Sequence, residues 1–283
     1  MTRDWSRYWR SADEPLEAMH AHFERHVYHR HSHETYSFGV TEAGAQSFTC
    51  RGSAHTSAAG MVMAFNADDP HDGWAADRLG FTYRMIHIGP ELVAGVLADG
   101  AGRPVGLPLF ADPVVSDPVL ARNLRDLHRA LLGGASALRR YELLAAAVHS
   151  AVGRAAVRTG PSRLTAAPAA PAEAGAVARR ARELIFSSYL DDITAGDLAA
   201  VTGCSRFGVH RAFKLAYGMA PSDYQRQLRL RAARRLIAQG QPISEAAARA
   251  GFADQSHLSR WFSRCYGVTP GAYQRAIPAA DRL

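Results

Sequence analysis

The chain has 283 residues, enough for about two domains that each bury a core of their own. Hydrophobic residues make up 47% of it, charged residues 21%, and the formal net charge is +7, which excludes a disordered chain, a collagen-like repeat and a small disulfide-rich protein. No apolar run reaches the roughly 18 residues of a membrane span and the N-terminus has no signal-peptide core, so a cytoplasmic protein without a membrane partner is expected. Cys50, Cys204 and Cys265 are far apart and form no C-x-x-C pair, which fits reduced thiols better than disulfides or a zinc site.

Residues 27–88 carry short strand-like runs separated by turn residues. The runs are Val27 to Val40, Gln46 to Cys50, Met61 to Phe65 and Phe81 to Ile88. The last two are rich in alternating apolar side chains. The pattern predicts that this part of the chain is mostly β-structure.

Two helices are predicted next, over residues 118–132 and 138–157. The first carries an apolar stripe of Leu120, Leu124, Leu127 and Leu131, and the second carries one of Leu143, Leu144, Val148 and Val152. Gly133 and Gly134 separate them. Two apolar-striped antiparallel helices suit a surface that forms a homodimer, and the alternative is that they only cap the β domain.

Charge and composition divide the chain. Thr159 to Gly175 is rich in Pro, Ala and Gly, as linkers are. From Ala178 onward there are 16 basic against 8 acidic residues, a net charge of +8, whereas the first 177 residues hold 17 against 18, a net charge of −1. We therefore expect an N-terminal domain over residues 1–158, a linker over 159–177 and a basic C-terminal domain over 178–283 that binds a polyanion, nucleic acid first of all.

The basic domain contains an internal repeat. A shift of 49 residues superposes seven residues on identical ones; the first copy is Phe213, Tyr217, Gly218, Pro221, Tyr224, Gln225 and Arg226, and the second is Phe262, Tyr266, Gly267, Pro270, Tyr273, Gln274 and Arg275. One small helical unit is therefore present twice.

The first copy has the pattern of a helix-turn-helix. Thr194 and Asp197 form a capping signal for a helix that Gly203 ends, and Ser205 is a good N-cap for the next helix. Val209 and Phe213 mark its apolar face, and its polar, cationic face is Arg206, Phe207, His210, Arg211 and Lys214. Such a second helix fits the major groove of double-stranded DNA.

The second copy repeats the pattern over Ser244 to Ala250 and Gln255 to Tyr266, with the outward residues Gln255, Ser256, Ser259 and Arg260. A linking helix over Ser222 to Gln239, N-capped by Ser222 and ended by Gly240, joins the copies. Its length of about 27 Å can place the two recognition helices about one turn of DNA apart, in successive major grooves.

Residues 178–283 resemble the DNA-binding domain of the AraC/XylS family of bacterial transcription regulators; the segment GFADQSHLSRWFSRCYGVTPGAYQR carries nearly every residue type of that family's signature. By this resemblance the DNA-contacting positions are Phe207, His210, Arg211, Gln255, Ser256 and Arg260. Arg206 and Lys214 fit phosphate contacts better than base contacts. The resemblance also implies an activator that helps recruit RNA polymerase.

Nine of the 13 histidines lie between His20 and His87. Strand alternation predicts that His29, His31 and His33 share one face. The H-x-H run, Gly60 to Phe65 and Pro70-His71 resemble the cupin barrel over residues 20–90, which is also the usual effector domain of this regulator family. The predicted effector pocket consists of His31, His33, Tyr36, Phe38, Phe65, His71, Trp74, Tyr83 and His87.

Three roles are open for His31, His33 and His71: a metal site, recognition of a small molecule, and a structural or surface role. Metal-bearing cupins supply a carboxylate a few residues after H-x-H, where this chain has Ser37, and Glu34 points to the other sheet face. Recognition of a small molecule, or a structural role, is therefore favoured, and no metal or cofactor is expected.

The sequence thus predicts an α+β protein: a cupin-like β-barrel with a helical hairpin, followed by an all-α domain with two helix-turn-helix units. The predicted function is a sequence-specific, ligand-responsive transcription regulator, an activator that acts as a homodimer. The alternatives are a metal-dependent cupin enzyme fused to a DNA-binding module and a ligand-independent DNA binder. No Ser-His-Asp, Walker or dinucleotide motif is present, so no enzyme activity is expected.

Overall fold

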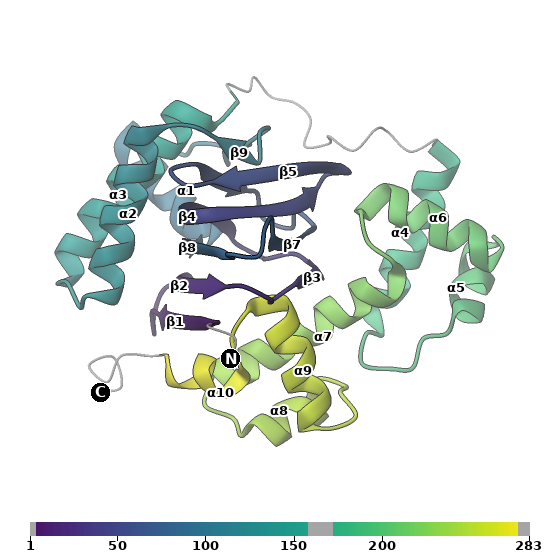
Figure 1. Ribbon diagram of the computed structural model, residues 1–283. Coiled ribbons are helices and arrows are strands. Elements are labelled where there is room, and N and C mark those ends of the chain that lie inside the picture. The colour runs from purple at the N-terminus through teal and green to yellow at the C-terminus, as the bar shows by residue number, and fades with distance from the viewer. Residues whose placement is uncertain (1–3, 158–171, 277–283) are drawn as a thin grey trace.

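The computed structural model in Figure 1 describes residues 4–157 and 172–276. Most of the predicted linker, residues 159–171, lies outside these ranges. The remainder of the predicted linker is helical, because helix α4 (Ala172–Ser187) begins inside it. None of the helices in the two described ranges is long and apolar enough to cross a membrane.

The N-terminal domain is an antiparallel β-barrel built around one long strand. This strand is β4 (Tyr36–Cys50). The first half of β4 pairs with β8 and β6 and the second half with β5 and β7, so β4 belongs to both walls of the barrel. It bends at Gly44, whose φ is +69° and where a Cβ atom would lie 2.1 Å from the carbonyl oxygen of Gly80. The strands are β1 (Trp5–Arg10), β2 (Leu16–Phe23), β3 (Tyr28–His31), β4 (Tyr36–Cys50), β5 (Ser53–Ala58), β6 (Val62–Phe65), β7 (His71–Ala75), β8 (Phe81–Ile88) and β9 (Val114–Val115).

Side-chain alternation gives the barrel wall two apolar faces. Tyr83 and Met85 of β8 point into the barrel, whereas Ile86 and Ile88 point outward against helices α1 (Pro90–Ala101), α2 (Pro118–Leu132) and α3 (Ala137–Ala155). These helices cover the outer face of the sheet, on the left in Figure 1. The inner face is left to line a cavity.

The predicted apolar stripe of α2, the first helix of the hairpin, is buried in the core of the N-terminal domain. Leu120, Leu124, Leu127 and Leu131 are at most 2% exposed and pack against the sheet. The helices therefore cap the barrel, as the second interpretation of the stripe expected. A homodimer contact made by the hairpin would have to use its outer face.

The C-terminal domain consists of α4 and six further helices: α5 (Ala195–Thr202), α6 (Arg206–Tyr217), α7 (Pro221–Ala238), α8 (Ile243–Arg249), α9 (Gln255–Tyr266) and α10 (Pro270–Arg275). Helices α6 and α9 are offset by 49 residues at both ends, as the repeat predicts. Each ends at a left-handed glycine, Gly218 with φ +67° and Gly267 with φ +69°.

The predicted caps hold with one exception. Thr194 and Asp197 form the capping box of α5, and the Ser205 hydroxyl accepts a hydrogen bond at the start of α6. Ser222 is not the cap of α7, because the helix begins one residue earlier at Pro221. The proline ring presets φ for the first helical turn, so no side-chain cap is needed there.

The two helix-turn-helix units are anchored differently. The unit of α5 and α6 has its own core with α4, centred on Ile185, Val209 and Phe213. The unit of α8 and α9 shares one core with the barrel interior, in which Met19 and Phe48 of the barrel join Leu258 and Phe262 of α9. Figure 1 shows α9 and α10 below β1 to β3 and the first unit beside the barrel. The second unit is thus packed against the interior of the N-terminal barrel.

Candidate effector cavity and DNA-binding surface

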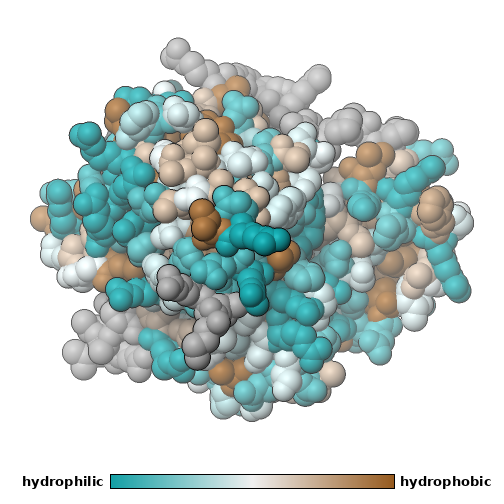
Figure 2. Space-filling model, viewed as in Figure 1, coloured by the Kyte–Doolittle hydropathy of each residue, from teal (hydrophilic) through white to brown (hydrophobic). Residues whose placement is uncertain are grey.

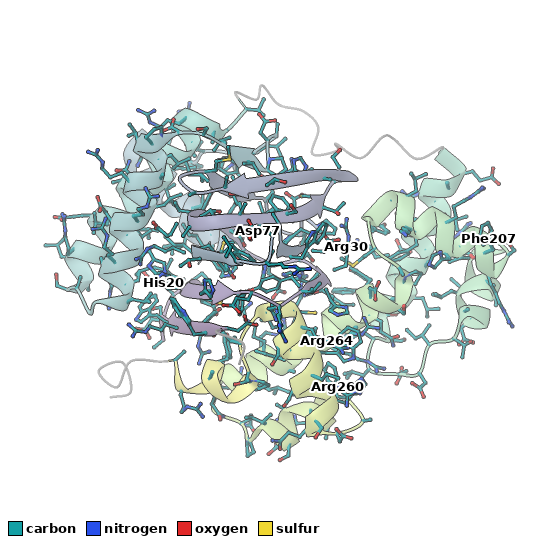
Figure 3. All side chains as sticks on the ribbon, in the orientation of Figure 1. His20, Arg30, Asp77, Phe207, Arg260 and Arg264 are labelled. Carbon is teal, nitrogen blue, oxygen red and sulfur yellow. The ribbon has the colours of Figure 1, made fainter. Side chains whose placement is uncertain are left out.

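The recognition helices turn the predicted DNA-contacting side chains to solvent. Phe207 is 74% exposed, and Figure 3 shows it at the outer edge of the first unit, with Arg260 on the second unit. Ser259 is half-buried, and the other predicted positions are exposed: Arg206, His210, Arg211, Lys214, Gln255, Ser256 and Arg260. The opposite faces of both helices are buried in their cores, so the packing fixes which side is outward.

Three of the arginines of α7 face the barrel instead. Arg231 pairs with Asp68 at 2.6 Å, Arg234 pairs with Glu17, and Arg235 pairs with Glu34 at 3.5 Å. The barrel therefore pairs with three cations of the helix that links the two helix-turn-helix units.

The pair of Glu17 and Arg234 is the buried part of this interface. The Tyr273 hydroxyl donates to Glu17 at 3.0 Å, and the Tyr8 hydroxyl donates to its second oxygen. Burial alone would raise the pKa of Glu17, but Arg234, His87 and the two hydroxyls outweigh it and lower that pKa. The carboxylate is therefore charged at neutral pH and holds α7 and α10 to the barrel.

A cavity of about 40 Å³ lies between the barrel and the second unit. Six predicted effector residues line it: His31, His33, Phe65, His71, Tyr83 and His87. Eight further barrel residues line it that the sequence analysis missed: Met19, Tyr28, Gln46, Phe48, Met63, Asp72, Gly73 and Met85.

Three predicted pocket residues lie elsewhere. Tyr36 and Phe38 point to the outer face of β4, where both pack against Phe110 and the Tyr36 hydroxyl donates to the carbonyl of Pro108 at 2.9 Å. On this strand the cavity side carries Ser37 and Gly39, because neighbouring side chains alternate. Trp74 is 38% exposed and does not line the cavity, although its neighbour Gly73 does.

The prediction that His29, His31 and His33 share one face was wrong for His29. β3 has a register shift between Tyr28 and His31, so the strand does not alternate regularly. The His29 ring consequently packs against Trp261 of α9, at 5.4 Å between centroids, and not in the cavity. His33 lies beyond the end of the strand and still converges with His31.

The cavity histidines form a tight cluster. The Nε2 atoms of His31 and His33 are 3.2 Å apart, and the His71 ring lies 4.5 Å from that of His31. The His33 and His87 rings are also 4.5 Å apart. Burial lowers the pKa of His87 to about 4 and, together with the neighbouring histidines, lowers that of His31 and His33 well below the ordinary value. The imidazoles are therefore neutral at pH 7.

The second recognition helix closes the cavity. Cys265 and Tyr266, the last two residues of α9, line it, and the Tyr266 ring lies 6.0 Å from that of His33. The Tyr28 hydroxyl, hydrogen-bonded to Tyr83 at 2.6 Å, lies against Gly267. No local pattern marks these residues as cavity residues, because they meet the barrel only through the docking of the two domains.

Comparisons with known proteins agree with this architecture. Residues 15–150 match the family described as the AraC-like ligand binding domain, and residues 198–276 match a helix-turn-helix domain. The chain is 27% identical over 230 residues to the uncharacterized HTH-type transcriptional regulator YbfI of Bacillus subtilis, which covers 81% of this chain and 80% of that protein. It is 40% identical over 85 residues to the transcriptional activator NphR of a Rhodococcus species, over 30% of this chain and 25% of that protein.

Solved structures of ToxT from Vibrio cholerae share the fold. An apo variant of ToxT has a TM-score of 0.56 at 12% identity, over 94% of this chain and 98% of that one. The unsaturated fatty acid bound wild-type form has a TM-score of 0.51 at 11% identity, over 97% and 95%. At this identity the likeness concerns the fold alone.

Proposed function

Because the chain belongs to the AraC/XylS family of transcription regulators, with a ligand-binding barrel ahead of a double helix-turn-helix domain, we propose that the cavity beneath α9 is its effector site. One observation carries the proposal. Cys265 and Tyr266 of the second recognition helix line the same cavity as His31, His33 and His71 of the barrel. A molecule that occupies the cavity therefore touches the DNA-reading helix directly.

The occupant changes DNA binding by shifting a population. When the domains are docked, three α7 cations are paired with barrel carboxylates and the second unit is fixed on the barrel. The first unit has its own core, so the two units need not keep one relative orientation when the second unit loosens. An effector that binds the docked and loosened forms unequally shifts their ratio, and with it the fraction able to reach two major grooves.

On DNA, α6 and α9 act as the two recognition helices. Arg211 and Arg260 hold corresponding positions and fit contacts to guanine, and Arg206 and Lys214 fit phosphate contacts. Phe207 can pack on a thymine methyl group and His210 can donate to guanine. The 18-residue α7 sets the distance between the two helices.

The regulator acts in the cytoplasm as a homodimer and as an activator that contacts RNA polymerase. The outer side of the helical hairpin supplies a contact surface for a second copy: Leu138 and Tyr141 lie about one turn apart on α3 and are exposed, Leu138 by 71%. On the face seen in Figure 2, hydrophobic residues form small separate areas among hydrophilic ones. Analytical ultracentrifugation of a Leu138→Arg variant tests the homodimer, and an unchanged dimer would contradict this surface.

Selection from a random duplex library tests sequence-specific binding. The full-length protein should enrich a bipartite site whose halves lie about 10 base pairs apart, and specific binding should exceed non-specific binding by about 1,000-fold or more. Uniform weak retention of all duplexes would contradict the proposal. The selected site then serves as the probe for effector experiments.

A thermal-shift panel tests the sensor function. A ligand at about 100 times its dissociation constant stabilises the folded state by about 2.7 kcal/mol, which shifts the melting temperature measurably. Fatty acids belong in the panel because one ToxT structure has an unsaturated fatty acid bound. A cavity of about 40 Å³ favours a ligand much smaller than a fatty acid, unless the second unit moves and enlarges the cavity. A panel without any stabilising ligand would favour the ligand-independent DNA binder.

A further inference from the structure

The three cavity histidines lie close enough together to form a candidate metal site. The ligand atoms of His31, His33 and His71 all lie within 4.8 Å of one another. Two imidazole nitrogens that are each about 2.0–2.1 Å from a tetrahedral zinc ion lie about 3.3 Å apart, and the Nε2 atoms of His31 and His33 are 3.2 Å apart. We propose that these histidines bind one divalent transition-metal ion and that this ion is the effector. The inference rests on the proposed function and names the class of the occupant.

The hydrogen bonds orient two of the three rings for coordination. His31 Nδ1 lies 2.6 Å from the carbonyl of His29, and His71 Nδ1 lies 2.8 Å from the carbonyl of Asp69. A carbonyl only accepts, so both Nδ1 atoms carry the proton and both Nε2 atoms offer a lone pair to the cavity. Metal-binding histidines are held in the same way, with the second ring nitrogen donating to a carbonyl or carboxylate.

The donor set selects the class of metal. Three imidazole nitrogens suit zinc, nickel, copper or iron, whereas magnesium and calcium require oxygen ligands. The acidic residue among those that line the cavity, Asp72, accepts from Arg30 and from the Thr49 amide. The site therefore favours a transition metal held by neutral ligands.

The cavity volume fits an ion better than a metabolite. Its 40 Å³ holds an ion with a water ligand, whereas small-molecule pockets measure about 300–1,000 Å³. From the sequence, the missing carboxylate at Ser37 argued against a metal. In the structure the Ser37 hydroxyl lies 2.8 Å from His87 Nδ1. Zinc sites with three protein ligands take a water molecule as the fourth ligand, so three histidines need no carboxylate beside them.

A bound ion reaches the DNA-binding domain through α9 and α7. The Tyr266 ring covers His33, and the guanidinium of Arg234 lies 5.4 Å from the centre of that ring. Two added positive charges below Tyr266 repel Arg234 and weaken its attachment to the barrel. The ion therefore loosens the docking of the second unit.

The test is a metal titration of the chelator-stripped full-length protein. Zn²⁺ is followed by calorimetry and Co²⁺ by its visible absorption, which reports nitrogen coordination in the unaltered protein. One ion should bind per chain. His33→Gln and His71→Gln should each lower the affinity at least about 100-fold. His29→Gln is the matched control, because this histidine lies four residues before His33 but its ring is outside the cavity, and the variant should bind metal like the unaltered protein.

The outcomes separate this inference from the proposed function. No stoichiometric binding, or binding that both variants leave unchanged, overturns the metal site. Because His71 is buried, its variant is first checked for folding by circular dichroism, and the half-buried His33 provides the second variant. If the selected duplex is still bound specifically while no metal is bound, the metal inference fails and the regulator remains. If metal is bound but no duplex is preferred, the metal site remains, whereas the proposed function and the effector role of the ion both fail.

Discussion

Glu17 of β2 and Arg234 of α7 form an ion pair between the barrel and the linking helix, with side chains 9% and 14% exposed. Tyr8 and Tyr273 donate to the same carboxylate, and the guanidinium lies over the rings of Tyr266 and Tyr273. The pair therefore connects the sensor domain to the second DNA-reading unit at a buried point.

Loss of this pair should destabilise the docked form. Arg234→Gln leaves the buried Glu17 carboxylate without its cation, which costs about 3–5 kcal/mol, whereas the exposed pair of Arg235 and Glu34 is worth at most about 1 kcal/mol. Urea unfolding of Arg234→Gln and of the control Arg235→Gln measures both. Equal losses of unfolding free energy in the two variants would show that the buried pair stabilises the protein no more than the exposed pair does.

The two left-handed glycines offer a matched comparison of docking. Alanine at Gly218 or Gly267 meets the same backbone penalty of about 1–2 kcal/mol. At Gly267 the new Cβ atom would also lie 2.2 Å from the Tyr28 hydroxyl, whereas at Gly218 the nearest atom is the flexible end of Arg30 at 3.3 Å. Gly267→Ala should therefore lose about 1–3 kcal/mol more than Gly218→Ala.

A second substitution checks the cause of that difference. Tyr28→Phe removes the clashing hydroxyl, so combining it with Gly267→Ala should recover part of the loss in a urea melt. If the loss of unfolding free energy in the double variant equals the sum of the losses in the two single variants, the clash with the barrel is not the cause.

Arg211 and Arg260 should contribute to sequence preference. Each change to Ala should cost about 1–3 kcal/mol of specific binding and relax the preference at one half of the site. Arg249→Ala is the control, because this arginine lies on α8 and pairs with Glu245. The measurement is a gel-shift titration with selected and scrambled duplexes. A uniform loss on both duplexes would identify the two arginines as phosphate contacts.

His128 should make the protein less stable in acid. Its Nε2 donates to the Met19 carbonyl at 2.9 Å and its Nδ1 accepts from Arg84 at 3.1 Å, so the folded protein holds it neutral, and burial lowers its pKa to about 3. Below about pH 6.5 the unfolded chain takes up a proton that the folded chain does not. Stability is therefore lost as the pH falls from about 6.5 towards 3, by at most about 1.4 kcal/mol per pH unit.

His128→Gln isolates this contribution, because its amide can donate to Met19 without titrating. The free energies of unfolding of the two proteins, measured between pH 7 and pH 4.5, should converge or cross as the pH falls. Parallel curves would mean that other histidines cause the acid sensitivity.

The predictable parts of this protein depend on local sequence. Capping boxes, left-handed glycines and the 49-residue repeat are properties of short segments, so both recognition helices and their outward faces follow from them. Strand β2 was missed because Leu16 to Met19 are buried on both faces and show no alternation. Helix α1 and the strands β1, β5, β7 and β9 were not predicted either.

The candidate cavity depends on tertiary structure and was only partly predictable. The histidines on β3, β7 and β8 were predicted correctly. Tyr36 and Phe38 were not, because side chains alternate along β4 and these two lie on the outer side of the sheet. Tyr266 and Cys265 join the cavity from more than 170 residues further along the chain than His87. Only the docking of the two domains brings them there.

Helix α9 divides its surface by position along its length. Its first two turns carry Ser256 and Arg260, and its last two residues, Cys265 and Tyr266, cover the cavity. Under the proposed function, mutations that change promoter recognition and mutations that change effector binding therefore fall on separate residues of one helix. Either property can then evolve without changing the residues that determine the other, whereas any tilt of α9 displaces the residues at both of its ends.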